Sequence, residues 1–139
     1  MHYDVLVLLS QACPDLHGTI RQRLLPFKAD EDGVVHWRWD WYKIGGGPFS
    51  DPAVTALFSE LDESVKTCIC RVGLLPADYS VAALLTPDGA WHDIEDFGWR
   101  VIDKGSEKNA IAHDLWRKHF RQTVAKFHGA ISVEVHCHG

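Results

Sequence analysis

The chain has 139 residues, of which 46% are hydrophobic and 24% charged, and this balance is typical of one globular domain with its own core, here residues 1–139. No apolar run reaches 18 residues and the amino terminus lacks a basic signal segment, so we expect neither a membrane span nor secretion and predict a cytoplasmic protein. Residues 1–103 carry eight Lys and Arg against 16 Asp and Glu, and an acidic surface of this kind argues against direct, sequence-independent nucleic-acid binding.

The first part of the chain predicts a strand, a helix and a second strand. Residues 3–9 are apolar or β-branched at nearly every position, which favours a strand buried on both faces. Leu16, Ile20 and Leu24 recur at helical spacing and predict a helix with one apolar face. Residues 34–44 alternate with period two and are rich in aromatic side chains, so they predict a strand.

The segment HWRWDWYKIGGG lies within and just after this predicted strand. The alternation places Trp37, Trp39 and Trp41 on one face, and Asp40 and Tyr42 on the other. A packed core and an exposed surface for a protein partner both explain such a tryptophan stripe. The three glycines match no nucleotide-binding motif, so we expect a turn that lets another backbone approach closely.

The middle of the chain predicts a helix and then a hairpin. Asp51 followed by Pro52 is a typical helix start, with the aspartate as N-cap. Residues 80–85 and 90–94 flank a TPDG turn and predict an antiparallel hairpin. Residues 98–103 are expected to add a third strand.

The last part predicts the longest helix and a closing strand. Ser106 is the expected N-cap of a helix over residues 107–128, and residues 130–138 alternate as a strand. The expected core stripe of the helix is Ile111, Leu115, Phe120, Val124 and Phe127, with Trp116 beside it. These elements predict an α+β domain with a mostly antiparallel sheet and two to three helices packed on one face, of which a ferredoxin-like arrangement is one form.

Histidines gather near the two ends of the chain. His136 and His138 are two residues apart on the last predicted strand, so they share a face. If that strand pairs with the first, His2 lies nearby. Three imidazoles beside Asp4 or Asp40 would suit Zn²⁺ or Mn²⁺. The sequence contains no standard zinc motif, however, so the favoured interpretation is a set of surface histidines without a metal, and the metal site is the alternative.

Four motifs occur in this order along the chain: HYDVLV, WDWYKIGG, TPDGAWHDIEDFGW and VEVHCH. Together they resemble a family of small uncharacterised proteins of bacteriophages and prophages, with a central W-D-W-Y-x-I-G-G-R-W motif and a D-C-H sequence in the last strand. This chain has Gly47 and Pro48 where the family has Arg-Trp, and His136 where it has Asp. The missing arginine would be a natural anion anchor, so a function that depends on it is not expected here.

The resemblance, the acidic body and an aromatic cluster without a catalytic motif predict a non-enzymatic binding protein encoded by a phage or mobile element, without a cofactor. We expect its partner to be a host protein, specifically a nucleic-acid-binding defence complex, which it would inhibit as an anti-CRISPR does. The predicted contact residues are Trp37, Trp39, Asp40, Trp41, Tyr42, Trp91 and Trp99. The alternative is a small metal-dependent hydrolase or nucleotide-signal-binding protein that uses His2, Asp40, His136 and His138.

Overall fold

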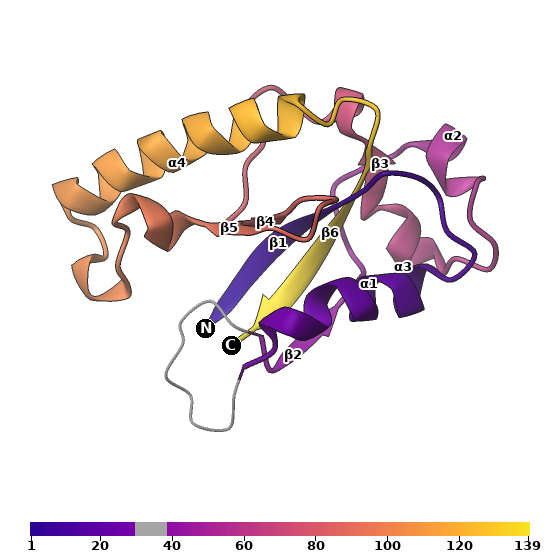
Figure 1. Ribbon diagram of the computed structural model, residues 1–139, viewed down its shortest axis with the longest axis horizontal. Helices are drawn as coiled ribbons and strands as arrows, with labels where there is room; N and C mark the ends of the chain where they lie inside the picture. Colours follow the sequence, from indigo (N-terminus) through magenta and orange to yellow (C-terminus); the bar gives the residue numbers. More distant parts are fainter. Residues whose placement is uncertain (30–38) are drawn as a thin grey trace.

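The computed structural model describes residues 1–29 and 39–139, which form a mixed six-stranded sheet with helices around it (Figure 1). The two long strands, β1 (His2–Leu9) and β6 (Ile131–His138), lie side by side and antiparallel. Nearly all of β1 is buried, as expected for a central strand. The pairing brings the two chain ends together, and the Met1 ammonium group donates to the Gly139 carbonyl at 2.8 Å.

Four short strands complete the sheet. β2 (Trp41–Lys43) and β3 (Ile69–Arg71) both pair antiparallel with β6. β4 (Ala83–Leu85) pairs parallel with β1 and forms the expected hairpin with β5 (Trp91–Asp93). The α+β class and the mostly antiparallel sheet are therefore confirmed. The strand beside β1 is the first of the hairpin, whereas a ferredoxin-like sheet places the second there.

The helices differ greatly in length. They are α1 (Leu16–Leu24), α2 (Pro52–Thr55), α3 (Glu63–Lys66) and α4 (Glu107–Ala125). Ser106 caps α4 as expected, because its hydroxyl accepts the Asn109 N–H at 3.1 Å. Val101–Asp103, expected in a third strand, forms a 3₁₀ helix instead.

Helices α1 and α4 contact opposite faces of the sheet. On one face, Glu134 of β6 accepts a hydrogen bond from Tyr79, whose ring packs against α4. Tyr42 pairs with an odd-numbered residue of β6 and so lies on the other face. There Trp39 packs against Tyr42 and donates its indole N–H to the Leu24 carbonyl of α1. The two long helices therefore lie on opposite faces of the sheet (Figure 1). The sequence pattern had predicted that the helices pack on one face.

The buried face of α4 differs from the expected stripe. Ile111 and Leu115 are 56% and 51% exposed, whereas Trp116 and Phe120 are fully buried. The Trp116 indole donates to the Val81 carbonyl at 2.8 Å, which fixes the rotation of the helix about its axis. The predicted stripe was based on apolar residue type alone, and it included Ile111 and Leu115, which this rotation turns toward solvent.

Asp51 is the N-cap residue of α2 and Pro52 begins the helix, as expected, but the Asp51 side chain makes no capping hydrogen bond. Its carboxylate is buried and accepts hydrogen bonds from the Arg71 backbone N–H at 2.9 Å and from the guanidinium Nε at 3.1 Å. The charged side chain therefore joins the start of α2 to β3, and the helix is only four residues long. The need of a buried carboxylate for charged or N–H partners outweighs the local capping preference.

The glycine turn brings two backbones close together, as the sequence predicted. A Cβ atom placed on Gly47 would lie 2.5 Å from the Thr67 carbonyl oxygen and 2.9 Å from Cys68 Cα. The neighbouring Phe49 N–H donates to the same Thr67 carbonyl at 2.8 Å. Only glycine fits at position 47 without moving one of the two segments.

Replacing Gly47 with alanine is expected to lower the free energy of unfolding by about 1–3 kcal/mol, because the added methyl group meets backbone atoms that cannot easily give way. Urea denaturation followed by tryptophan fluorescence measures the change. Gly129→Ala is the matched control, since a Cβ at that position meets nothing within 4 Å. Equal losses in the two variants would contradict the close approach at Gly47.

Candidate functional site at the paired termini

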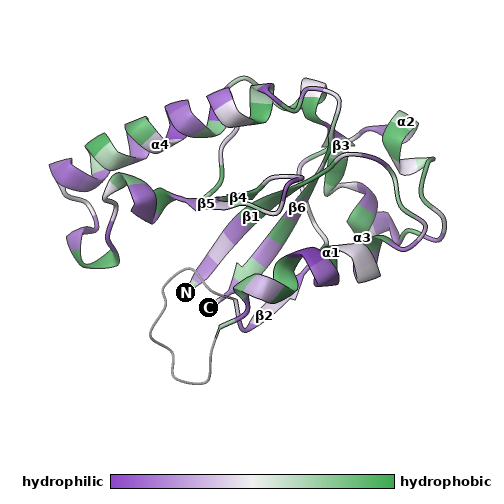
Figure 2. Ribbon diagram, in the orientation of Figure 1, coloured by the Kyte–Doolittle hydropathy of each residue, from purple (hydrophilic) through white to green (hydrophobic). Residues whose placement is uncertain are grey.

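The three histidines expected near one another do come together. In the antiparallel pairing of β1 and β6, His2 lies opposite His138 and Asp4 lies opposite His136. Directly opposed residues, and residues two apart, share a face of the sheet, so all four side chains project to the same side. Hydrophilic residues appear in both strands toward the termini (Figure 2).

Two carboxylates hold two of the imidazoles. His136 Nδ1 lies 2.9 Å from Asp4 Oδ1, and His138 Nδ1 lies 2.8 Å from Asp40 Oδ1. His2 joins both: its Nδ1 is 3.3 Å from His136 Nε2, and its ring centroid is 4.8 Å from that of His138. The result is one connected network of three imidazoles and two carboxylates.

The network assigns the tautomers when the rings are neutral. A carboxylate accepts only, so His136 and His138 each donate Nδ1–H and keep a lone pair on Nε2. His2 then donates Nδ1–H to His136 Nε2 and keeps its own lone pair on Nε2. Two unprotonated Nε2 atoms, those of His2 and His138, remain available to a ligand or a proton.

The charge states support this assignment. Partial desolvation, followed by the charges of His138 and His136, holds the pKa of His2 below its usual value. The hydrogen bond from His138 holds the pKa of Asp40 below its usual value as well. Near neutral pH, His2 is therefore a neutral base and Asp40 an anion.

A polar cavity of about 320 Å³ adjoins the histidines. It is lined by Asp4, Lys43, Gly45, Gly46, Glu134 and His136. Glu134 accepts the Tyr79 O–H at 2.6 Å, and burial raises the pKa of both Glu134 and Tyr79. The cavity thus offers carboxylates, an imidazole and one ammonium group to a small polar molecule.

Among the described residues, no group of three or more His, Cys, Asp or Glu side chains is arranged so that it could hold a metal ion. The three imidazoles are close, but their Nδ1 atoms and Nε2 of His136 are engaged with one another and with the carboxylates. Carboxylates bind Nδ1 of His136 and of His138, so Nε2 of each ring points away from its carboxylate. Histidine ligands of metal ions are oriented by carboxylates in the same way.

The aromatic segment does not alternate as the sequence predicted. Trp39 is 6% exposed and Trp41 is 52% exposed, so the two do not share a face. Trp39 pairs in a bridge with Lys28 instead of continuing β2, and the Asp40 N–H donates to the His138 carbonyl at 2.8 Å. The chain bends between Trp39 and Trp41, because Trp39 pairs with Lys28 and Asp40 bonds to His138. Trp37 lies outside the described residues.

The other predicted contact residues are distributed over the molecule. Trp41 lies directly opposite His138 and next to the histidine network. Trp91 stacks on Phe27 with ring centroids 4.8 Å apart, on the far hairpin strand. Trp99 lines a separate small cavity beside Trp116. Apart from Trp41 and its neighbour Asp40, these side chains do not form one surface with the histidines.

Sequence reasoning missed three residues of the site. Glu134 lies two residues before His136 on the same face of β6, so the alternation of the last strand contained the signal for it. Lys43 lies across from His136, and Tyr79 comes from a loop. Neither position carries a local signal, because only the pairing of distant segments places them here.

None of the helices in the described part of the chain is both long and apolar enough to cross a membrane. Comparisons of the chain with protein-family models, with curated proteins and with solved structures find no match. The resemblance to phage and prophage proteins therefore stays a prediction, and the argument for function rests on the geometry of the paired termini.

Proposed function

We propose that the protein is a small metal-dependent hydrolase whose ion is held by His2, His136 and His138. The observation that carries this proposal is the pair of carboxylate–imidazole contacts, Asp4 to His136 and Asp40 to His138. Histidine ligands of metals usually donate their other ring N–H to a carboxylate or carbonyl in this way.

The spacing of two nitrogens supports binding of one ion. His2 Nδ1 and His136 Nε2 are 3.3 Å apart, and an ion bound between them would replace the proton that His2 Nδ1 donates to His136, with His2 taking its other tautomer. Two nitrogens that each lie about 2.0–2.1 Å from a tetrahedral Zn²⁺ are themselves about 3.3–3.4 Å apart. His138 would supply the third ligand, since its ring centroid lies 4.8 Å from that of His2 and its side chain is 40% exposed.

The charges favour a cation. Asp4, Asp40 and Glu134 surround the imidazoles, and the lowered pKa of His2 keeps its lone pair free for coordination near neutral pH. Lys43 supplies one positive charge on the cavity wall, where it would hold an anionic substrate group. A bound Zn²⁺ would activate a water molecule for attack, and the polar cavity beside it suits a small ester or phosphoester.

The test uses tag-free protein with the amino-terminal sequence unchanged, because a histidine tag or an extension before His2 would obscure the site. Isothermal titration with ZnCl₂ is expected to give one ion per chain. Asp4→Asn is expected to weaken binding about 10–100-fold. His136→Ala is expected to weaken it at least as much, and His113→Ala, which removes an exposed histidine of α4, is expected to leave it unchanged.

Hydrolysis is measured separately with bis(4-nitrophenyl) phosphate and 4-nitrophenyl acetate. Turnover that depends on Zn²⁺ and is lost in His136→Ala supports the enzyme. Zinc binding without hydrolysis of either compound overturns the hydrolase, and an absence of binding overturns the metal site itself.

A second candidate is the host-protein inhibitor expected from the sequence, acting in the cytoplasm of a host cell as a phage-encoded anti-defence protein. The observation that favours it is Trp41, which is 52% exposed next to Asp40 and opposite His138. Exposed tryptophans are frequent anchors of protein interfaces. Plaque counts on bacteria with and without an active CRISPR system test it. Expression of the wild-type chain should restore plaques and Trp41→Ala should not, and equal plaque counts with and without expression would remove this candidate.

A further inference from the structure

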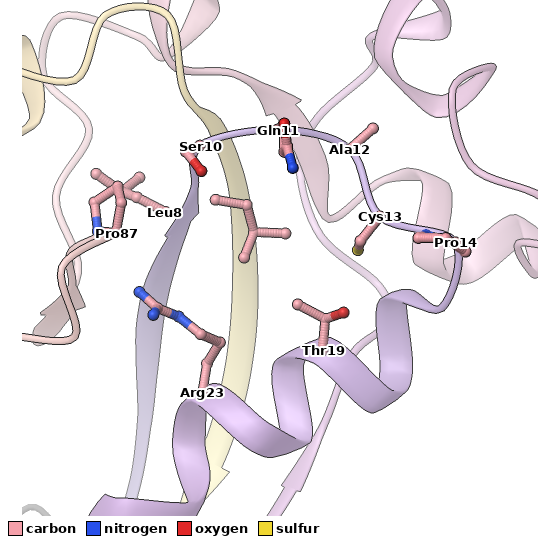
Figure 3. Close-up of a pocket in the computed structure, with 10 residues that line it drawn as sticks. Leu8, Ser10, Gln11, Ala12, Cys13, Pro14, Thr19, Arg23 and Pro87 are labelled. Atoms are coloured by element: carbon pink, nitrogen blue, oxygen red, sulfur yellow. The ribbon is translucent and has the colours of Figure 1, made fainter.

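A second cavity lies at the opposite end of β1 from the histidines. It has a volume of about 260 Å³ and opens where β1 ends and the chain turns into α1 (Figure 3). Polar groups on its walls come from Ser10, Gln11, Cys13, Thr19 and Arg23. Pro87, which follows β4, forms the facing wall, so the cavity lies at the carboxyl ends of the two parallel strands. In open sheets with parallel strands, ligands bind at such ends.

Arg23 gives this cavity its charge. Its guanidinium group extends from α1 toward Leu8 and Pro87 (Figure 3). One terminal nitrogen donates to the Thr86 carbonyl at 2.6 Å, which fixes the side chain between the helix and the hairpin. No described acidic residue lines the cavity, and Arg23 forms no ion pair with a carboxylate in the described part of the chain.

Among the described residues, the Nε–H of Arg23 has no hydrogen-bond acceptor, and the atom is buried. A buried donor without an acceptor is unfavourable, and more so when the group is charged. The Nε atom itself has almost no exposed surface, so a molecule in the cavity would meet the terminal nitrogens of Arg23.

We propose that this cavity binds a small oxyanion group, a carboxylate or a phosphate, against Arg23. The guanidinium offers its planar donors to the anion, and the hydroxyl groups of Ser10 and Thr19 line the same space. The site is separate from the histidine network and does not depend on the proposed hydrolase activity.

The test follows backbone amide signals of the full chain by NMR while sodium phosphate or sodium acetate is added at constant ionic strength. Saturable shifts confined to residues 8–14, 19–23 and 86–88 are expected with at least one of the two anions, and the anion that saturates at lower concentration identifies the preferred class. Arg23→Gln is expected to weaken binding at least tenfold. Arg21→Gln removes the same charge from an exposed position of the same helix and is expected to change binding less than twofold.

Arg23→Gln also removes the hydrogen bond to Thr86, so a second variant guards against a change of fold. Thr19→Val combined with Ser10→Ala keeps Arg23 in place and is expected to weaken binding several-fold without altering signals far from the cavity. Shifts spread over the surface, or equal weakening by the Arg21 and Arg23 variants, show nonspecific charge binding and overturn the proposal. Absence of saturable shifts with both anions overturns it as well.

Discussion

Replacing Trp116 with alanine is expected to lower the free energy of unfolding by about 3–5 kcal/mol, a large part of the stability of a domain of this size. Trp116 is 1% exposed, in the middle of the buried face of α4. Its ring contacts Phe97 and Phe120, with centroids 5.9 and 5.8 Å away, and its indole N–H donates to the Val81 carbonyl. Alanine would leave a cavity and also an unpaired, partly buried carbonyl.

Urea denaturation gives the magnitude, and the neighbouring residue supplies the control. Leu115→Ala removes a large apolar side chain that is half exposed, so its expected effect is within about 0.5 kcal/mol. If Trp116→Ala does not fold, Trp116→Phe keeps most of the volume and still loses the hydrogen bond, with an expected loss of about 1–2 kcal/mol. A larger effect at Leu115 than at Trp116 would mean that the buried face of α4 is the one that the sequence pattern suggested.

Replacing Asp51 with asparagine is expected to lower the free energy of unfolding by about 2–3 kcal/mol at neutral pH, since charge-assisted hydrogen bonds to Arg71 are lost in a buried setting. The carboxylate is 3% exposed, although the Arg71 side chain is about half exposed, which limits the effect. Circular dichroism during thermal or urea unfolding measures it. Asp62→Asn, at an exposed helix start whose side chain makes no capping bond, is expected to change stability by no more than about 0.5 kcal/mol.

The same carboxylate makes stability depend on pH. Burial by itself raises the pKa of Asp51, but the hydrogen bonds from Arg71 outweigh it and the pKa lies below the ordinary 3.8. A lowered pKa means that the unfolded chain takes up the proton first, so this contribution is complete above pH 3.8 and decreases as the pH falls through the lowered value. Asp51→Asn should therefore lose less stability than the wild type over that acidic range. Parallel acid profiles for the two proteins would contradict the ion pair.

The two proposed sites lie at opposite ends of β1, and both depend on the strands beside it. At the amino end, the antiparallel partner β6 brings two histidines and the carboxyl terminus to His2. At the carboxyl end, the parallel partner β4 places Pro87 across from the loop that leads into α1. A single central strand thus positions the proposed cation-binding cluster and the proposed anion-binding cavity, each made from segments that are distant in sequence.

Local patterns alone predicted the central strands, the hairpin, the Ser106 cap and the close approach at the glycine turn. These features follow from backbone sterics, hydrogen-bonding groups of neighbouring residues and the period-two alternation of a strand, all of which act within a few residues. The same alternation placed His136 and His138 on one face. The proximity of His2 was expected only on the condition that the last strand pairs with the first, and that long-range pairing is shown by the structure.

Only the tertiary structure determined the contacts of several residues for which the sequence allowed more than one partner. Trp39 lies against α1 and not beside Trp41, the Asp51 side chain binds Arg71 instead of making a capping hydrogen bond, and α4 turns Trp116 inward and Ile111 outward. From the sequence, each of these residues could make either local or long-range contacts, because apolar and carboxylate side chains are compatible with both. The environment of each residue depends on the segment that packs across from it. The positions of the carboxylates that orient the histidines depend on the same long-range packing. The sequence by itself determined the elements and the chemistry at the chain ends, and long-range packing determined how that chemistry is arranged.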